Sequence, residues 1–557
     1  MGGGVTDATD VVIVGSGAGG AAAAWALTAA GLRVLVLEAG PRFDPAVDYP
    51  LTDPDWERRA FPAPPGSTAE VLYGDLGRLD PADADLQSFD AVTPRRAPGE
   101  LRVPGRVGYS HVRGVGGSTL HYVGEAHRLH PSSFKLARDH GVGADWPFSY
   151  DDLAPFYDRA ERAIGVAGPE RQTGRPRATA FPQTAHPLSP AARRLVEAGA
   201  RIGLPFEANS RAVLSRPEGG RPACNYCGQC SRGCPIGDKG SSDVTFLRQA
   251  AATGRLTVRA GAEVTRLEIG RGGRVVALRY VRDGIEQRLE TPTLILAAGA
   301  VQTPRLLLAS AAPELPEGVA NGSGQVGRNF METLRWQGTA LLPGLTDSHK
   351  GLPADAVSWA ENAPDALPGA VGGCRYTSAV QETGLTGPIG YATRLLPGHG
   401  AAFHARLRQA FGSAITVGAT GAVVPDARSH VRLHPERRDG LGAPLPVIAS
   451  VLTDNSLALM HHMAAQGRAL LRAAGAGAPL EQITSWDRFT STHVFGTARM
   501  GGDSATSVTD ADGRCHDHDN LWIADASLFP SSGGGEGPSL TIHALAIRAA
   551  ERIMAGR

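Results

Sequence analysis

The sequence lacks a net charge. Lysine and arginine together number 55, aspartate and glutamate also number 55, and no basic stripe is visible along the chain. A protein that binds a phosphate backbone needs a local surplus of positive side chains. Nucleic acid is therefore excluded as an expected partner.

The chain also lacks any uninterrupted apolar run of the roughly 18 residues that cross a bilayer. Its first residues, MGGGVTDATDVVIVGSG, have neither the basic segment nor the cleavage site of a secretory signal. We expect a cytoplasmic protein without an integral membrane segment, although export beside a partner with a twin-arginine signal stays open. No internal repeat is visible, and 557 residues of ordinary globular composition predict two to four domains.

Cysteine is scarce, at six residues, yet four of them fall in the run CNYCGQCSRGCP, residues 224–235. The spacing C-x2-C-x2-C-x3-C-P is that of iron–sulfur ligands in bacterial ferredoxins, but the second run of a two-cluster ferredoxin is missing. Three interpretations stay open: a 4Fe-4S or 3Fe-4S cluster, a zinc ion held by four thiolates, or free or disulfide-linked cysteines in a loop. The metal ligands in the first two cases are Cys224, Cys227, Cys230 and Cys234.

The N-terminal segment has the pattern of a dinucleotide-binding unit. VVIV, residues 11–14, predicts a buried strand, and it is followed by GSGAGG, a small-residue helix and a second strand that ends at Glu38. Gly15 permits the tight turn, Gly17 lets the backbone approach a pyrophosphate, and Gly20 lets helix and strand pack closely. The helix N-terminus offers free N–H groups to phosphate, and Glu38 is placed to accept ribose hydroxyls.

Further pieces of the same domain lie far along the chain, at TLILAAGAVQTPRLLLAS (293–310) and LWIADASLFP (521–530). The other domains are then insertions within one chain-long fold, a layout that suits a flavoprotein better than a compact NAD module. Residues 331–480 alternate apolar and polar stretches, as antiparallel strands do, before a helix that contains His461 and His462. Adjacent residues on a helix point about 100° apart, so this pair is not expected to bind one metal ion.

Six motifs in this order resemble those of the glucose-methanol-choline (GMC) oxidoreductases: GSGAGG with Glu38, RGVGGSTLHYVG (113–124), GQVGRNFMETL (324–334), HVFGTARMGG (493–502), LWIADASLFP and GPSLTIHALAIRAAERI (537–553). The resemblance implies an α/β, Rossmann-like FAD-binding domain built from discontinuous segments and an α+β substrate domain with an antiparallel sheet. We assign the FAD domain to 8–45, 100–130, 240–330 and 488–557, a cap to 46–99, a connecting region to 131–239 and the substrate domain to 331–487.

The resemblance also implies which residues act. His493 matches the catalytic histidine, and imidazole with an unperturbed pKa near 6.5 is suited to take the hydroxyl proton while hydride passes to flavin N5. Its alternative role is that of a hydrogen-bonded structural residue. The second histidine or asparagine of the family is replaced by Gly537, beside Glu536, which is either a substrate-orienting group, a partner of His493 or a turn residue.

Beyond the N-terminal unit, the resemblance implies cofactor contacts from Gly117, Ser118, His121, Val264, Asp525 and Pro538. His121 aligns with a histidine that is bonded covalently to flavin in some relatives, and a pocket-lining residue beside non-covalent FAD is the alternative.

The predicted function is FAD-dependent oxidation of an alcohol, by resemblance a sugar, polyol or glycoside hydroxyl. An iron–sulfur cluster would favour a dehydrogenase with a protein or quinone electron acceptor. Without a cluster, an oxidase that makes hydrogen peroxide is as well supported as a dehydrogenase. A flavin-binding protein without turnover and an NAD-dependent enzyme are the other hypotheses.

Overall fold

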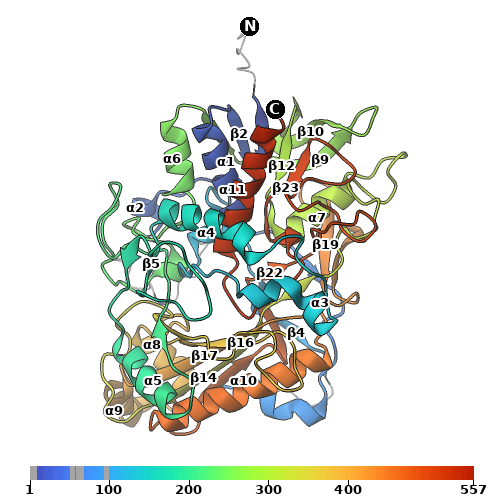
Figure 1. Cartoon of the computed structure of the whole chain (residues 1–557). Coiled ribbons are helices and arrows are strands. Elements are labelled where there is room, and N and C mark those ends of the chain that lie inside the picture. The colour runs from blue at the N-terminus through green and yellow to red at the C-terminus, as the bar shows by residue number, and fades with distance from the viewer. Residues whose placement is uncertain (1–8, 50–56, 58–67, 93–99) are drawn as a thin grey trace.

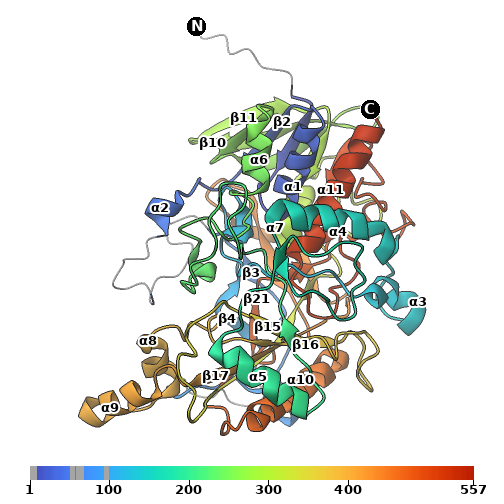
Figure 2. The same cartoon turned by 60° about the vertical axis from the view of Figure 1, so that its left-hand side comes forward.

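The computed structural model describes residues 9–49, 57, 68–92 and 100–557. It places a parallel sheet at one end of the molecule and an antiparallel sheet at the other (Figures 1 and 2). The predicted cap, 46–99, lies partly outside the described residues.

The parallel sheet assembles strands from three distant parts of the sequence. Its order is β23-β12-β1-β2-β8, with every neighbouring pair parallel, and its strands are β1 (Val11–Val14), β2 (Val34–Glu38), β8 (Leu256–Ala260), β12 (Leu294–Leu296) and β23 (Leu521–Ile523). The strands β1, β2, β12 and β23 are buried throughout, as continuous apolar runs in a covered parallel sheet should be. The predicted discontinuous α/β fold is confirmed.

Helices from both ends of the chain pack together beside this sheet. The first, α1 (Ala18–Ala29), is built mostly of alanine and glycine and lies against α11 (Ser539–Ala555), as Figure 1 shows. Nearby elements are α4 (Tyr150–Ile164), α6 (Phe246–Ala252), α7 (Gly299–Ala309) and the antiparallel strands β9 (Glu263–Ile269), β10 (Val275–Arg282) and β11 (Ile285–Glu290). Arg557 pairs with Asp10, so the two ends of the described chain meet.

The antiparallel sheet has six strands in the order β20-β14-β17-β16-β15-β7. They are β7 (Glu207–Ala208), β14 (Leu334–Leu341), β15 (Ala356–Ser358), β16 (Cys374–Ser378), β17 (Ala414–Gly421) and β20 (Glu481–Thr484). The predicted helix, α10 (Asp454–Ala473), buries Leu459, Met463 and Leu470 and packs on β14 and β17. His461 and His462 pair with Asp83 and Glu361 respectively, so each has its own carboxylate partner.

The remaining strands and helices belong to neither of these two sheets. The strands are β3 (Leu72–Tyr73), β4 (Val103–Tyr109), β5 (Ala167–Gly168), β6 (Gln183–Thr184), β13 (Met331–Glu332), β18 (His430–Arg438), β19 (Pro444–Ala449), β21 (Arg488–Ser491) and β22 (Val494–Phe495). The helices are α2 (Pro45–Asp48), α3 (Leu136–His140), α5 (Pro190–Arg201), α8 (Pro388–Gly390), α9 (Gly400–Ala410), a π-helix at Tyr391–Leu395 and 3-10 turns at Pro81–Leu86, Gly117–Leu120, Pro131–Lys135, Cys230–Arg232 and Ala526–Leu528.

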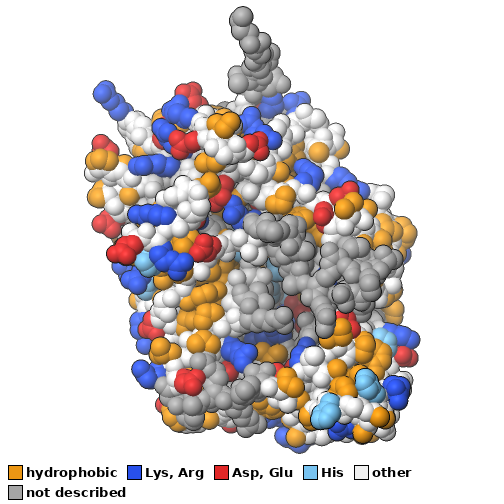
Figure 3. All heavy atoms as spheres, turned by 180° about the vertical axis from the view of Figure 1, so that it is seen from behind, with side chains coloured by type: hydrophobic (Ala, Val, Ile, Leu, Met, Phe, Trp, Pro, Cys, Tyr) orange, Lys and Arg blue, Asp and Glu red, His pale blue; other side chains and the backbone are white. Residues whose placement is uncertain are grey.

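The surface mixes charges of both signs. Figure 3 shows blue Lys and Arg side chains interspersed with red Asp and Glu side chains on the rear face. Within the described residues, no helix is both long and apolar enough to cross a membrane.

Candidate active site

A single cavity of about 710 Å³ extends from the parallel sheet to the antiparallel sheet. At one end it is lined by residues at the carboxyl ends of parallel strands, including Val14, Glu38 and Ala297. At the other end it is lined by Arg335 and Thr377 of the antiparallel sheet. Ligands of open α/β sheets bind at the carboxyl ends of the strands, so the location is that of a nucleotide site.

The glycine turn after β1 forms the floor of the first end. Gly15 has φ +94°, and a Cβ there would lie 2.5 Å from the carbonyl oxygen of Ala297. Gly17 lines the cavity, and a Cβ on the facing Gly117 would lie 2.6 Å from its Cα. Gly20 lies outside the cavity, where a Cβ would approach the carbonyl oxygen of Gly15 to 2.0 Å. The first glycines thus leave space for a ligand, and Gly20 lets α1 pack on β1.

The Glu38 carboxylate closes this end at the last residue of β2. One oxygen accepts from the Ser16 backbone N–H at 3.0 Å and hydroxyl at 2.7 Å, and the other accepts from the Gly40 N–H at 2.9 Å. Burial raises the pKa of Glu38, and these hydrogen bonds oppose that shift. A carboxylate fixed in this way at the cavity wall is suited to accept ribose hydroxyls.

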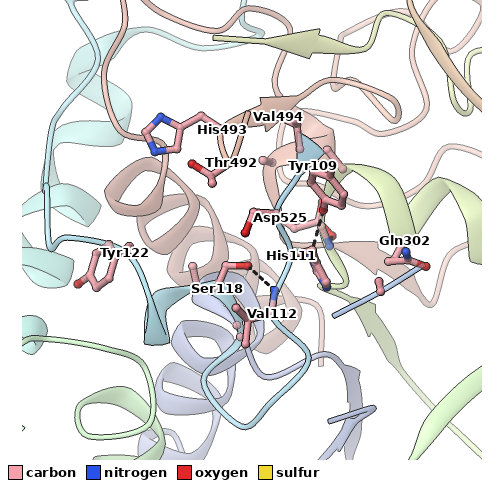
Figure 4. A pocket seen from close by; sticks show the side chains of 18 of the residues that line it. Tyr109, His111, Val112, Ser118, Tyr122, Gln302, Thr492, His493, Val494 and Asp525 are labelled. Carbon is pink, nitrogen blue, oxygen red and sulfur yellow. Dashed lines mark hydrogen bonds between the residues drawn. The ribbon is translucent and has the colours of Figure 1, made fainter. Parts of the chain in front are cut away.

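The remaining predicted cofactor residues surround the middle of the cavity. Ser118, His121, Val264, Asp525 and Pro538 all line it. The Ser118 hydroxyl accepts from the Val112 N–H at 3.2 Å (Figure 4), and Asp525 accepts from the Gly299 N–H at 2.9 Å. Together with the α1 N-terminus, the glycine cradle and Glu38, they form a site that fits an extended dinucleotide such as FAD.

The imidazole of His493 projects into the other half of the same cavity (Figure 4). It lies between β21 and β22, where its backbone oxygen accepts from the Ser491 hydroxyl at 2.8 Å. Burial lowers the pKa of His493 to about 4; Glu125 opposes this shift and Arg375 reinforces it. The ring is therefore neutral at pH 7 and has a free lone pair for a proton.

Comparison with known proteins matches this geometry to a family. Two family models, both described as GMC oxidoreductase, match residues 11–334 and 425–546. The chain belongs to the GMC oxidoreductase family. The predicted resemblance is confirmed, and FAD is the cofactor expected of a GMC oxidoreductase.

Relatives of this GMC chain are similar over nearly its whole length. It is 31% identical to 6'''-hydroxyparomomycin C oxidase of Streptomyces lividus, over 98% of this chain and 91% of that protein. It is 28% identical to the fructose dehydrogenase large subunit of Gluconobacter japonicus, over 99% and 98% of the two chains. The crystal structure of pyridoxine 4-oxidase from Mesorbium loti shares the fold, with a TM-score of 0.60 and 20% identity over 98% of this chain and 99% of that one.

Glu536 lies away from the GMC cavity. It is fully buried, pairs with Arg175 at 2.7 Å and accepts from the N–H groups of His130 at 3.1 Å and Gly534 at 2.5 Å. The cavity-lining residue at this point is its neighbour Gly537. The structure thus places His493 in the same cavity as the predicted cofactor residues, and Glu536 is not among the residues that line it.

The four clustered cysteines do not converge on one point. All four are free thiols, and the Cys234 thiol donates to Asp238 at 2.5 Å. No group of three or more His, Cys, Asp or Glu side chains among the described residues is arranged to hold a metal. The predicted iron–sulfur cluster and its zinc alternative therefore do not fit this loop.

A buried lysine links the cysteine loop, through hydrogen bonds, to backbone next to the cavity. The Lys239 ammonium donates to the backbone oxygens of Leu120, Tyr122 and Cys230 at 2.8–2.9 Å. The adjacent Ser231 lines the cavity. This loop therefore forms part of the cavity wall next to the turn that carries His121.

Sequence reasoning missed several polar side chains of the cavity. Glu125 and Arg375 form a bidentate ion pair at 2.7 Å, while Arg335 and Glu382 line the wall without a salt bridge to any described residue. Glu125 directly follows the motif RGVGGSTLHYVG, which is the one signal available for it. Arg335 likewise directly follows the motif GQVGRNFMETL, whereas Arg375 and Glu382 stand in no recognisable motif.

Proposed function

We propose that this GMC oxidoreductase oxidises an alcohol to a carbonyl compound with FAD as the electron acceptor. One observation carries the proposal. The glycines and carboxylate suited to a dinucleotide and the neutral imidazole of His493 line the same cavity. A cofactor held at Gly15, Gly17 and Glu38 and extending through that cavity approaches His493.

Bound FAD would supply the two-electron acceptor that takes the carbinol hydrogen as hydride. His493 takes the hydroxyl proton, because its depressed pKa keeps the ring neutral at working pH. Removal of that proton lets the carbon–oxygen bond become a carbonyl as the carbon–hydrogen bond breaks. The alcohol loses two electrons and two hydrogens in total.

The substrate half of the cavity supports a hydrophilic alcohol. Its lining includes Arg335, Gln337, Arg375, Thr377 and Glu382, which offer charged and neutral hydrogen-bonding groups on several sides. A sterol-like molecule would leave these groups unsatisfied at a cost. We therefore infer a sugar, polyol or glycoside hydroxyl as the reacting group, in line with the relatives named fructose dehydrogenase and 6'''-hydroxyparomomycin C oxidase.

The final electron acceptor is either oxygen or an organic or protein acceptor such as a quinone. The preference for a dehydrogenase depended on an iron–sulfur cluster, and the cysteine loop does not fit one. No step of the proposed reaction passes through a cluster. Stopped-flow reoxidation of the reduced enzyme by air separates the two: fast formation of hydrogen peroxide identifies an oxidase, and slow reoxidation identifies a dehydrogenase.

Anaerobic flavin bleaching tests the proposed oxidation. The purified FAD enzyme is mixed without air with D-fructose, D-gluconate, paromamine or 2-methyl-1,2-propanediol, and the loss of the oxidised flavin absorbance is followed. We expect bleaching by at least one of them and a loss of roughly 100-fold or more in its rate in His493→Ala. His461→Ala, on the exposed side of α10, is the matched control and should bleach like the wild type.

The other hypotheses predict different results. A flavin-binding protein without turnover stays yellow with every alcohol of a wider panel. An NAD-dependent enzyme is colourless when purified.

A further inference from the structure

The ion pair between Glu125 and Arg375 lies in the wall of the cavity that His493 also lines. Both side chains line the cavity, and both guanidinium Nη atoms donate to the carboxylate at 2.7 Å. The side chains of Arg375 and Glu125 are only 4% and 7% exposed respectively. Both charges act on the imidazole, since they shift the pKa of His493 in opposite directions.

The pair is held rigidly from behind. The Arg375 Nε–H donates to the backbone oxygen of Gly535 at 2.6 Å, and the Asn209 side-chain amide donates to Glu125 at 2.9 Å. Burying two charges costs several kcal/mol of desolvation per ion, so a buried pair is weak grounds for a purely stabilising role. A role in the cavity accounts better for its position.

Gly537 lines the cavity next to Glu125 and has room for a side chain. A Cβ at this position would lie 3.6 Å from the Cβ of Glu125 and 3.7 Å from Nδ1 of His127, both ordinary contact distances. Its φ is outside the left-handed region, so the backbone accepts a side chain. The side chain that the family resemblance assigns to the substrate oxygen is therefore missing at a cavity-lining position next to Glu125.

The proposed reaction needs a donor at this point. As the hydroxyl proton passes to His493, negative charge develops on the substrate oxygen, and a fixed N–H donor in a site closed to water stabilises it. A guanidinium has five N–H donors. Three of those on Arg375 serve Gly535 and Glu125, which leaves two for a ligand.

We propose that Arg375, positioned by Glu125, donates a hydrogen bond to the reacting oxygen of the substrate and replaces the side chain that Gly537 lacks. This inference rests on the proposed function. The hydroxyl proton goes to a ring nitrogen of His493, and the carbinol hydrogen leaves with its electron pair to the bound FAD. Arg375 transfers no proton, and Glu125 is a positioning residue that acts through Arg375.

The test compares Arg375→Gln with the wild type in anaerobic bleaching, using the fastest of the four alcohols of the panel as the probe. We expect the limiting rate to fall by roughly 100-fold, as for removal of an oxyanion donor, with a smaller change in the half-saturating concentration. The limiting rate of Arg375→Lys, which keeps the positive charge, should lie between those of the wild type and Arg375→Gln. The limiting rate of Glu125→Gln should fall about tenfold or more, because two carboxylate oxygens no longer hold the guanidinium in place.

A rescue variant separates this role from a structural one. Gly537→Asn in the Arg375→Gln background restores an amide donor, and we expect it to recover about tenfold or more of the lost rate. Arg394→Gln breaks a partly buried ion pair, with Glu481, outside the cavity, and should lower the melting temperature without changing the limiting rate.

The outcomes distinguish the two proposals. If no alcohol bleaches the wild type, the proposed function fails. If the wild type is bleached and Arg375→Gln with full flavin content is bleached equally fast, the role of Arg375 is overturned. If Arg375→Gln does not retain FAD, the same comparison is made with Arg375→Lys, and a wild-type rate there also overturns it.

Discussion

The charge states of single residues in the cavity are set by burial. His493 and His121 both lie in its wall, and burial lowers their pKa values to about 4 and about 3. Glu382 shifts the other way: burial and the nearby Glu125 raise its pKa to about 7. The imidazoles are therefore neutral at pH 7, while Glu382 is balanced between its neutral and charged forms.

Glu382 should make binding of a cationic substrate depend on pH. Below about pH 7 the carboxyl is neutral, and above it the carboxylate attracts an ammonium group. We expect the dissociation constant of paromamine, measured by perturbation of the flavin spectrum, to fall between about pH 6 and 7.5, and Glu382→Gln to abolish that change. D-Fructose, which is uncharged, is the control; an unchanged paromamine profile in Glu382→Gln would contradict the prediction.

FAD should be held without a covalent bond to His121. The glycine cradle, the helix N-terminus and Glu38 already offer contacts along the cavity, and the proposed reaction needs no bond to the ring. We expect the yellow colour to remain in the supernatant when the protein is precipitated with acid. Colour in the precipitate that disappears in His121→Ala would show the opposite.

At the scale of elements, some backbone conformations are set by the residues of a short motif, and others depend on pairing with distant parts of the chain. GSGAGG predicts the turn between β1 and α1 correctly, because Gly15 adopts φ +94° and a Cβ on Gly20 would meet the carbonyl oxygen of Gly15 within the same turn. The strand β22, only two residues long, has no such signal. It is held by pairing with β13, whose Glu332 forms a fully buried bidentate ion pair with Arg102.

Substitutions of Gly20, within α1, and of Gly17, at its N-terminus, should affect folding and cofactor binding separately. Gly20→Ala places a methyl group 2.0 Å from a backbone oxygen, so we expect a loss of about 1–3 kcal/mol or more in stability of the apoprotein. Gly17→Ala meets only Gly117, at 3.8 Å, but extends into the cavity. Its melting temperature without FAD should match the wild type while its flavin content falls. Full flavin content in Gly17→Ala would show that the cofactor does not approach this turn.

At the scale of the whole molecule, buried neutral histidines should make the fold sensitive to acid. His127 and His543 are fully buried, and burial lowers the pKa of each to about 3. The unfolded chain binds their protons near pH 6.5 and the folded chain does not. The free energy of unfolding is therefore not reduced by these two histidines above about pH 6.5, and it declines as the pH falls from there toward 3.

His543 offers a direct measurement of this effect. Its ring packs on Phe246 at 4.9 Å, and neither nitrogen has a partner among the described residues. When the pH falls from about 7.5 to 5, protonation of this histidine in the unfolded chain should lower the free energy of unfolding by on the order of 2 kcal/mol. We expect His543→Leu to raise the melting temperature and to reduce its fall between these pH values. A melting temperature with the same pH dependence as the wild type would contradict the assignment.

The sequence by itself determined the GMC fold, the discontinuous dinucleotide domain and the segments that carry the cofactor residues and His493. These follow from local patterns, in which glycine spacing, strand hydropathy and helix starts constrain the backbone directly. Only the tertiary structure decided which polar side chains meet. Arg375 reaches Glu125 across 250 residues of chain, and Glu536 turns to Arg175 across 361. Such pairings depend on how distant elements pack, and no spacing within a motif encodes them.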